Sequence, residues 1–278
     1  PDVREPYSSI FKDVLGGIKR EAGGKVKSYA LKKDESVANL QKWLRKQNPE
    51  AVILLGNRGK SIAETVQREY VTLTGAAILS DHNINAGVVG ISLSPAPDRL
   101  FKKLKQLAPQ VKRVVVIYHP QTNGWLVELA QLAANELNIE LKPLPAQDVR
   151  EAAGLYQREL EGVLGGEDAV WLLQGDPTMD ERSLLLTILN KAWSSQTVVF
   201  SSNPSHVKRG ALFSLFPDNF GMGKSLALKV RQMKGGDNRK PEPLSDLLIA
   251  VNVRTAEHLN LNIDRSQLRD FDLIFPNR

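Results

Sequence analysis

The sequence predicts an α/β fold built on doubly wound, parallel sheets, and three observations lead to this prediction. Short runs rich in β-branched residues alternate with amphipathic stretches such as NGWLVELAQLAANELN at 123–138, almost from end to end. Runs such as RVVVIY at 113–118 lack polar alternation, which indicates strands covered on both faces. A length of 278 residues is enough for one large α/β unit or for two lobes.

The first predicted element is a helix over about residues 8–21. Because a βαβαβ lobe normally opens with a strand, we expect either that Pro1 and Asp2 are the last residues of that strand or that it lies before residue 1. Helical stretches separate most of the later strands, and the segment GGDNRKPEPLSD at 235–246 is rich in breakers and is predicted to be a linker. The predicted strands are VKSYAL (26–31), AVILLG (51–56), GAAIL (75–79), VVGISL (88–93), RVVVIY (113–118), IELKPL (139–144), AVWLLQ (169–174), TVVFS (197–201), ALFSLF (211–216) and LLIAVNV (247–253).

Two stretches end in Gly-Lys-Ser, as a phosphate-binding P-loop does. That loop requires a first glycine five residues before its second, so that backbone N–H groups can surround the phosphates. In GNRGKS at 56–61 the first glycine is replaced by Leu54, and in GMGKS at 221–225 it is replaced by Asp218. Neither stretch is predicted to bind a nucleotide, and no G-x-G-x-x-G follows a predicted strand.

The composition excludes several classes of site. The net charge is +6, but the Lys and Arg residues are scattered along predicted helices, so we expect no nucleic-acid partner. The chain has no cysteine, which excludes a Cys-based zinc site, a disulfide framework and a thiol nucleophile. The four histidines lack metal-site spacing, and no nucleophile pairs with a base. We therefore expect no catalytic residues, no metal and no cofactor.

The segments at the carboxyl ends of four predicted strands contain polar residues, small residues or proline. They read Gly56-Asn57-Arg58, His119 to Asn123, Gln174 to Pro177 and Ser201 to Pro204. In open parallel sheets ligands bind at these ends, although the same residue types also make ordinary turns and helix caps. Four such loops at one edge favour a binding site.

The order of the motifs from Val88 to Ile263 resembles the substrate-binding proteins of ABC transporters, and more narrowly the tryptophan- and tyrosine-type family. The family's middle motif and its tail motif are matched by Gly90, Ser92, Leu104, Leu107, Pro109, Lys112, Arg113, Tyr118 and Pro120, and by Val251, Asn252, Ala256, Leu259 and Leu261. The chain departs from the family pattern at His119, where the family has Asn. Where the family has a P-x-D-N segment, this chain reads Gln174-Gly175-Asp176-Pro177-Thr178. Asp176 is then the equivalent of the family's Asp, shifted in position.

This resemblance implies a type I periplasmic-binding-protein fold, with two Rossmann-like lobes joined by a three-crossover hinge that closes on a ligand. The crossings are expected near Leu93, Phe216 and Ser245. One lobe is then 1–92 plus 217–244, and the other is 93–216 plus 245–278.

Within this frame we assign candidate ligand-binding residues at the strand ends and helix starts. Asp176 and Asp218 also have structural alternatives, an Asx-turn and a helix cap, and Arg58 has the alternative of facing solvent. Trp125 is either a packed helix-face aromatic or a pocket wall. The candidates are Tyr7, Gly56, Asn57, Arg58, His119, Asn123, Gln174, Asp176, Ser201, Ser202 and Asp218.

The function that the resemblance implies is that of an extracytoplasmic solute-binding protein, not an enzyme. It would bind a small molecule, with an aromatic amino acid as the favoured ligand, and pass it to an ABC permease in the membrane. We expect a monomer in the periplasm or cell envelope, after removal of a signal or lipoprotein segment. The alternative is a ligand-sensing ectodomain or accessory protein of a signalling system with the same fold.

Overall fold

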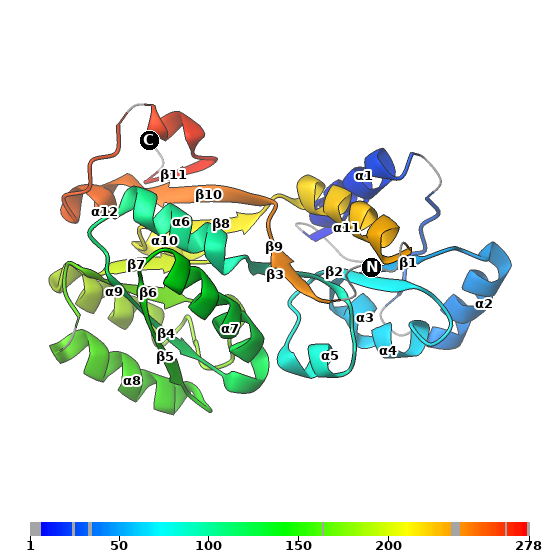
Figure 1. Ribbon diagram of the computed structural model, residues 1–278, viewed down its shortest axis with the longest axis horizontal. Helices are drawn as coiled ribbons and strands as arrows, with labels where there is room; N and C mark the ends of the chain where they lie inside the picture. The colour runs from blue at the N-terminus through cyan, green and yellow to red at the C-terminus, as the bar shows by residue number, and fades with distance from the viewer. Residues whose placement is uncertain are drawn as a thin grey trace. The chain divides into compact units, whose positions relative to one another are not determined.

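The strands of the computed structural model form two separate sheets (Figure 1). The structure describes residues 7–23, 26–32, 35–162, 164–234, 240–264 and 266–276. These divide into two compact units: unit 1 comprises Pro1–Leu93 with Pro217–Asp246, and unit 2 comprises Ser94–Phe216 with Leu247–Arg278. The chain therefore passes three times from one unit to the other.

The helices and strands alternate along most of the chain, and the predicted α/β class is confirmed. The helices are α1 (Tyr7–Glu21), α2 (Val37–Gln47), α3 (Gly56–Ser61), α4 (Ala63–Val66), α5 (Asp81–Asn85), α6 (Pro97–Leu107), α7 (Pro120–Glu136), α8 (Val149–Gly162), α9 (Leu185–Ser194), α10 (Pro204–Arg209), α11 (Asn219–Lys234) and α12 (Val253–His258). The strands are β1 (Val52–Leu55), β2 (Thr72–Ala77), β3 (Gly90–Pro95), β4 (Arg113–Tyr118), β5 (Glu140–Pro145), β6 (Asp168–Leu172), β7 (Val198–Ser201), β8 (Phe213–Pro217), β9 (Glu242–Leu244), β10 (Leu247–Asn252) and β11 (Leu273–Phe275).

Unit 1 is built on the sheet β1-β2-β3-β9, in which β1 pairs with β2 and β2 with β3 in parallel. One core of this unit joins α2 to the strands through Leu40, Leu44, Val52 and Leu54. Burial of such aliphatic side chains stabilises the fold by about 1.5–3 kcal/mol each. The amphipathic period of VANLQKWLRKQ places Leu40 and Leu44 on one face, which is why α2 packs on this sheet.

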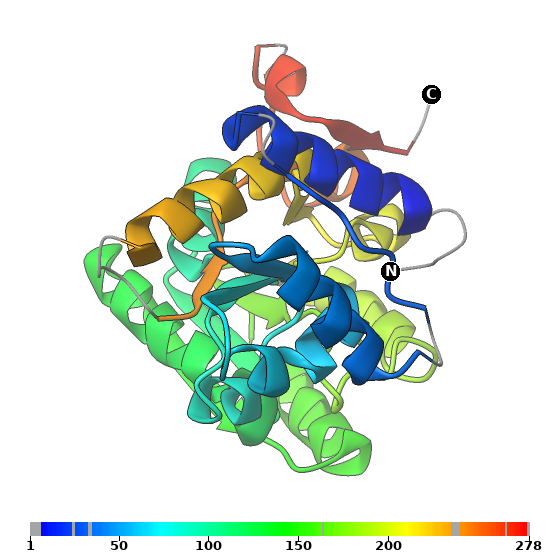
Figure 2. The same ribbon diagram turned by 90° about the vertical axis from the view of Figure 1, so that its right-hand side faces the viewer.

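Helices α1 and α11 run side by side in unit 1, as both views show (Figures 1 and 2). They cross at glycines: a Cβ on Gly223 would lie 2.1 Å from the carbonyl oxygen of Val14, and a Cβ on Gly17 would lie 2.1 Å from that of Phe220. The second Gly-Lys-Ser stretch therefore belongs to a helix crossing. Its glycine is required because only a residue without Cβ allows the two backbones to approach so closely.

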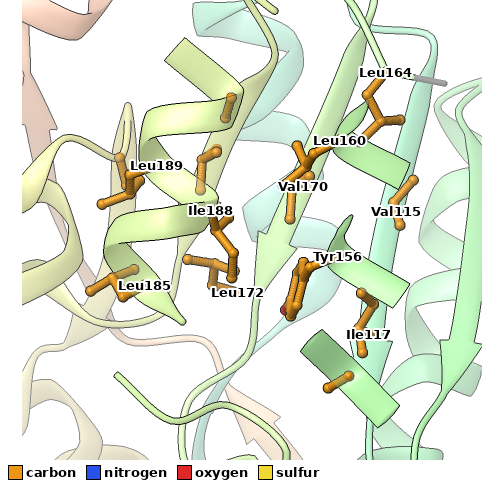
Figure 3. Packing of buried hydrophobic residues seen from close by; sticks show 14 of the residues in the cluster. Val115, Ile117, Tyr156, Leu160, Leu164, Val170, Leu172, Leu185, Ile188 and Leu189 are labelled. Atoms are coloured by element: carbon orange, nitrogen blue, oxygen red, sulfur yellow. The ribbon is translucent and has the colours of Figure 1, made fainter. Parts of the chain in front are cut away.

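Unit 2 is built on a sheet in the order β11-β10-β8-β7-β6-β4-β5. The pairs β4–β5, β4–β6, β6–β7, β7–β8 and β10–β11 are all parallel. Figure 3 shows one face of this sheet, where Tyr156 and Leu160 of α8 and Ile188 of α9 pack on Val170 and neighbouring strand residues.

The other face of the same sheet carries an aromatic core. Trp171 stacks on Phe200 with ring centroids 6.2 Å apart, and Phe200 stacks on Phe213 at 5.3 Å. Phe101 of α6 meets Trp171 edge to face at 5.6 Å. These strands are therefore buried on both faces, as the lack of polar alternation in RVVVIY and AVWLLQ predicts.

Three local predictions were wrong. Residues 26–31 form no strand: they bury Leu31 and pack Tyr29 against Trp43 at 5.1 Å, so side-chain packing on α2 replaces ladder hydrogen bonds. The segment after β4 is not a loop, because α7 begins at Pro120, whose fixed φ suits the first helical position. The predicted linker contains β9, and its residues 235–239 lie outside the described part of the chain.

Candidate functional site

The carboxyl edge of the seven-stranded sheet contains a topological switch point. The chain leaves β4 through α7 to β5 on one side, and then passes through α8 to β6 on the other side of β4. In open α/β sheets ligands bind outside the strand ends at such a point. Because β4 ends at Tyr118 and β6 at Leu172, the residues that follow these two strands form the candidate site.

Asp176 is the central acceptor of this edge, and its side chain is 5 % exposed. One carboxylate oxygen accepts hydrogen bonds from the backbone N–H of His119 at 2.9 Å and from Asn123 Nδ2 at 2.7 Å. The other accepts from the N–H and the hydroxyl of Thr178 at 2.9 and 2.6 Å. These bonds tie the loop after β6 to the first turn of α7. Burial, and then the nearby Asp176 charge, raise the pKa of Tyr156.

Two buried acceptor atoms at this edge have no donor among the described residues. Asn123 is fully buried, and because its Nδ2 faces Asp176, its Oδ1 points elsewhere and is unpaired. Gln174 Oε1 is also buried and unpaired. An unsatisfied buried acceptor costs about 1–3 kcal/mol, so such atoms are expected where a ligand or water supplies the donor.

A second polar group lies at the end of the neighbouring strand, β7. His206 is 2 % exposed, and its Nδ1 lies 2.8 Å from Ser201 Oγ, which also accepts from the backbone N–H of Asn203 at 3.1 Å. The other ring nitrogen, Nε2, lies 3.0 Å from a Glu181 carboxylate oxygen. Burial lowers the pKa of His206 despite that carboxylate, so the ring is neutral at neutral pH.

Between these two groups lies a cavity of about 120 Å³. It brings the β6 loop together with the start of α10 in the same unit. Its lining is Leu173, Gln174, Gly175, Asp176, Met179, Glu181, Asn203 and His206. Glu181, Met179 and His206 were not among the predicted site residues. No local pattern indicates Glu181, because it is remote in sequence from β7 and α10. For the contact between Ser201 and His206, the spacing of five residues is the one local signal in the sequence.

In unit 1 the corresponding edge follows β1. Gly56 has φ 74° and turns the chain directly into α3, where Asn57 is exposed. Arg58 Nη2 donates to the carbonyl of Glu35 at 2.8 Å, while its Nε is buried without a partner among the described residues. Lys60 Nζ donates to the carbonyl of Ile78 at 2.9 Å, and burial lowers its pKa.

Three predicted site residues remain: Asp218, Ser202 and Tyr7. Asp218 caps α11, because its Oδ1 accepts from the N–H of Gly221 at 2.9 Å. Ser202 is buried at the end of β7, next to Ser201. Tyr7 opens α1, and its side chain lies outside the described part of the chain. The predicted residues thus form one group in unit 2 (His119, Asn123, Gln174, Asp176, Ser201 and Ser202) and another in unit 1 (Gly56, Asn57 and Arg58).

Trp125 lies on α7 and is 8 % exposed, which agrees with the helix-face alternative. In the described part of the chain, no group of three or more His, Asp or Glu side chains could hold a metal ion. None of the described helices is both long enough and apolar enough to span a membrane.

The comparison with protein families decides what kind of protein this is. The model of the ABC transporter substrate binding protein family matches residues 25–270. The chain belongs to this family. Its fold is the type I periplasmic-binding-protein fold, with two lobes on parallel sheets, and the predicted family and fold are both confirmed. A search of the curated proteins gives no significant match.

Solved structures share the fold of this substrate-binding protein at low sequence identity. An ABC domain from Streptococcus pneumonia in complex with L-Trp is 20% identical, with a TM-score of 0.57 and 98% of each chain covered. A ligand-free, open substrate-binding protein with adhesive properties from Clostridium difficile is 14% identical, with a TM-score of 0.65, covering 99% of this chain and 97% of that one. A conserved domain protein from Vibrio cholerae is 19% identical, with a TM-score of 0.56 and coverage of 96% and 95%.

Proposed function

We propose that this substrate-binding protein captures a small solute outside the cytoplasm and delivers it to an ABC permease. Family membership supports solute capture. The observation in the structure that carries the proposal is the pair of buried, unpaired acceptors Asn123 Oδ1 and Gln174 Oε1 at the switch point. Buried polar atoms are normally paired, so these two atoms indicate a place where an incoming molecule supplies donors.

The proposed ligand is an amino acid, with aromatic side chains favoured. Unit 1 offers an exposed amide at Asn57 and the cations Arg58 and Lys60, neither of which has a carboxylate within ion-pair distance among the described residues. A ligand carboxylate would satisfy them. Unit 2 offers acceptors and negative charge at Gln174 and Asp176, which suit a ligand ammonium. The relative from Streptococcus, solved with L-Trp, supports the choice of tryptophan as the first probe.

Capture would involve no covalent chemistry. The ligand would lose its water and gain charge-assisted hydrogen bonds at the strand ends of both units, and a hinge closure would then be favoured because only the closed state makes all these contacts. Asp176 would act mainly as an organiser, because its oxygens already accept four hydrogen bonds from the chain and hold His119 and Asn123 in place.

Calorimetric titration with L-tryptophan, L-tyrosine and L-phenylalanine tests this proposal. We expect one site per chain for at least one of them, and an affinity about 10- to 100-fold weaker in Asn57→Ala, the loss of one hydrogen bond to a charged group. Asn190→Ala is the matched control, because Asn190 is likewise an exposed helical amide but lies outside the candidate site. Heat from none of the three amino acids, or equal weakening by both variants, would contradict the proposed ligand.

A further inference from the structure

Unit 1 carries all of the chain's net positive charge. Its residues, Pro1–Leu93 with Pro217–Asp246, contain 20 Lys and Arg against 14 Asp and Glu, whereas those of unit 2 contain 17 of each kind. Unit 1 therefore has a net charge of +6 and unit 2 is neutral overall. A unit of this sign attracts anionic partners, most strongly where several cations are exposed together.

Helix α11 presents part of this charge on one exposed ridge. Residues 219–234 contain no Asp or Glu. The exposed side chains Phe220, Lys224, Leu228 and Arg231 are spaced by four, four and three residues, so they follow one line along the helix. Lys224 Nζ lies 5.9 Å from the centroid of the Phe220 ring. Apolar and cationic side chains therefore alternate along the ridge.

Helix α1 continues the same surface. A Cβ on Gly16 would lie 3.5 Å from the Phe220 ring, and Glu21 forms an ion pair with Arg231, so the outer sides of the two helices adjoin (Figures 1 and 2). Except for Arg231, the exposed cations of this α1–α11 face form no ion pair with any described residue. These cations are Lys12, Lys19, Arg20, Lys224 and Arg231, and the carboxylates beside them are Asp13 and Glu21.

Phe220 and Leu228 give the face an apolar component as well. Each is 44 % exposed, and the two flank Lys224 on the ridge, so apolar area lies directly beside cations. At the surface of a bilayer, apolar side chains enter the boundary between headgroups and acyl chains, while Lys and Arg remain at the level of the phosphates. The pattern of the α1–α11 face matches both layers of such a surface.

We propose that the α1–α11 face binds the surface of a bilayer that contains anionic phospholipid. The cations contact lipid phosphates, and Phe220 and Leu228 enter the headgroup boundary. A lipid surface is favoured over an acidic protein, because Lys is depleted at protein–protein interfaces and three of the five cations here are Lys. The inference goes beyond the proposed function: it assigns a peripheral membrane contact to unit 1, whichever solute is captured.

Co-sedimentation with phospholipid vesicles tests the proposal. One set of vesicles contains phosphatidylglycerol and phosphatidylcholine in equal amounts, and the other contains phosphatidylcholine alone. We expect the protein to sediment with the anionic vesicles only. This binding should weaken as salt is added, because the Debye length falls from about 10 Å at 0.1 M to about 3 Å at 1 M. Equal binding to both sets, or binding to neither, would overturn the proposal.

Two ridge variants identify the groups responsible. Lys224→Gln should weaken partitioning onto anionic vesicles about fivefold, and Leu228→Ser should weaken it severalfold without changing the charge. The matched controls lie in unit 2: Lys208→Gln removes an exposed lysine of α10, and Leu132→Ser removes a leucine of α7 that is 63 % exposed. Both controls should bind like the unchanged chain.

Thermal unfolding shows that the variants are folded, because all four replaced side chains are exposed and their melting temperatures should match that of the unchanged chain. Unchanged vesicle binding in either ridge variant, or an equal loss in a ridge variant and its control, would overturn the assignment of this face.

The same measurements separate this inference from the proposed function. If L-tryptophan, L-tyrosine or L-phenylalanine gives binding heat while the protein does not sediment with anionic vesicles, the membrane face is refuted and solute capture stands. If vesicle binding depends on Lys224 and Leu228 while none of the three amino acids gives binding heat, the face stands and the proposed ligand fails.

Discussion

Replacing Asp176 by Asn tests whether this buried carboxylate organises the site. The amide is almost the same size, but its NH₂ group replaces an oxygen that accepts two hydrogen bonds. The less costly orientation turns the NH₂ group toward Thr178, where the bond from the backbone N–H is lost and the hydroxyl can rotate to accept. The bonds from His119 and Asn123 remain but go to a neutral oxygen. A hydrogen bond to a charged group contributes about 1.5–3 kcal/mol and one to a neutral group about 0.5–1.5 kcal/mol, so one lost and three weakened bonds cost about 3–6 kcal/mol.

Removing the charge also relieves the cost of burying a carboxylate, which offsets part of this loss. We therefore expect Asp176→Asn to lower the free energy of unfolding by about 2–4 kcal/mol. Urea unfolding followed by tryptophan fluorescence measures it, because Trp171 lies in the core of the same unit. The matched control is Asp98→Asn in unit 2, where the carboxylate is exposed and pairs with Lys102 at 3.2 Å; its loss should be below about 1 kcal/mol.

The sign of the effect decides between two roles for Asp176. A buried carboxylate whose charge is compensated only when a ligand binds destabilises the ligand-free protein, and its neutralisation would stabilise the fold. A variant as stable as the unchanged chain, or more stable, would therefore refute the organising role and favour direct ligand contact.

Three further predictions concern stability. Gly223→Ala should lower the free energy of unfolding in urea by about 2 kcal/mol, because its Cβ would meet a backbone oxygen at 2.1 Å. Gly154→Ala in α8 is the control: a Cβ there has no atom within 4 Å, so it should stabilise the fold by about 0.5–1 kcal/mol. Equal effects of the two variants would contradict the close crossing. Glu242→Ala should cost about 2–3 kcal/mol, since it leaves the 2 % exposed Lys229 without its carboxylate partner at 2.6 Å, and a loss below 0.5 kcal/mol would show that the pair contributes little. Burial lowers the pKa of His206 in the folded state, so the unfolded chain binds the proton at a higher pH than the folded chain does. The free energy of unfolding should therefore fall as the pH drops below about 6.5, and His206→Gln should flatten this part of the pH profile. An unchanged profile in the variant would contradict the burial of a neutral ring.

The sequence predicts the parallel α/β architecture because its strands are buried on both faces and lack polar alternation. RVVVIY matches β4 residue for residue, and the ends of β6 and β7 lie within two residues of their predicted positions. Residues 26–31 have the composition of a strand, but composition does not specify whether a neighbouring strand is available. Tertiary packing of Tyr29 and Leu31 determines the conformation there.

The candidate site is predictable only in part. Strand ends are visible in the sequence, so His119, Gln174 and Asp176 could be assigned to one edge. Their individual roles could not, because two of the four donors to Asp176 come from residues more than fifty positions away in the sequence. The approach of Glu181 to His206 likewise depends on the path of the loop after β6, which no local pattern specifies.

Thermal unfolding with a panel of candidate solutes tests the central claim of solute capture most directly. The panel contains the amino acids, sugars, nucleosides and small organic acids, each at saturating concentration. A ligand at about 100 times its dissociation constant adds roughly 2.7 kcal/mol of stability, which is about 5 °C or more for units of this size. The account predicts such a rise for one chemical class, with amino acids carrying both a carboxylate and a primary ammonium giving the largest shift. A melting temperature unchanged by every member of the panel would contradict solute capture and favour a sensing role that depends on a protein partner.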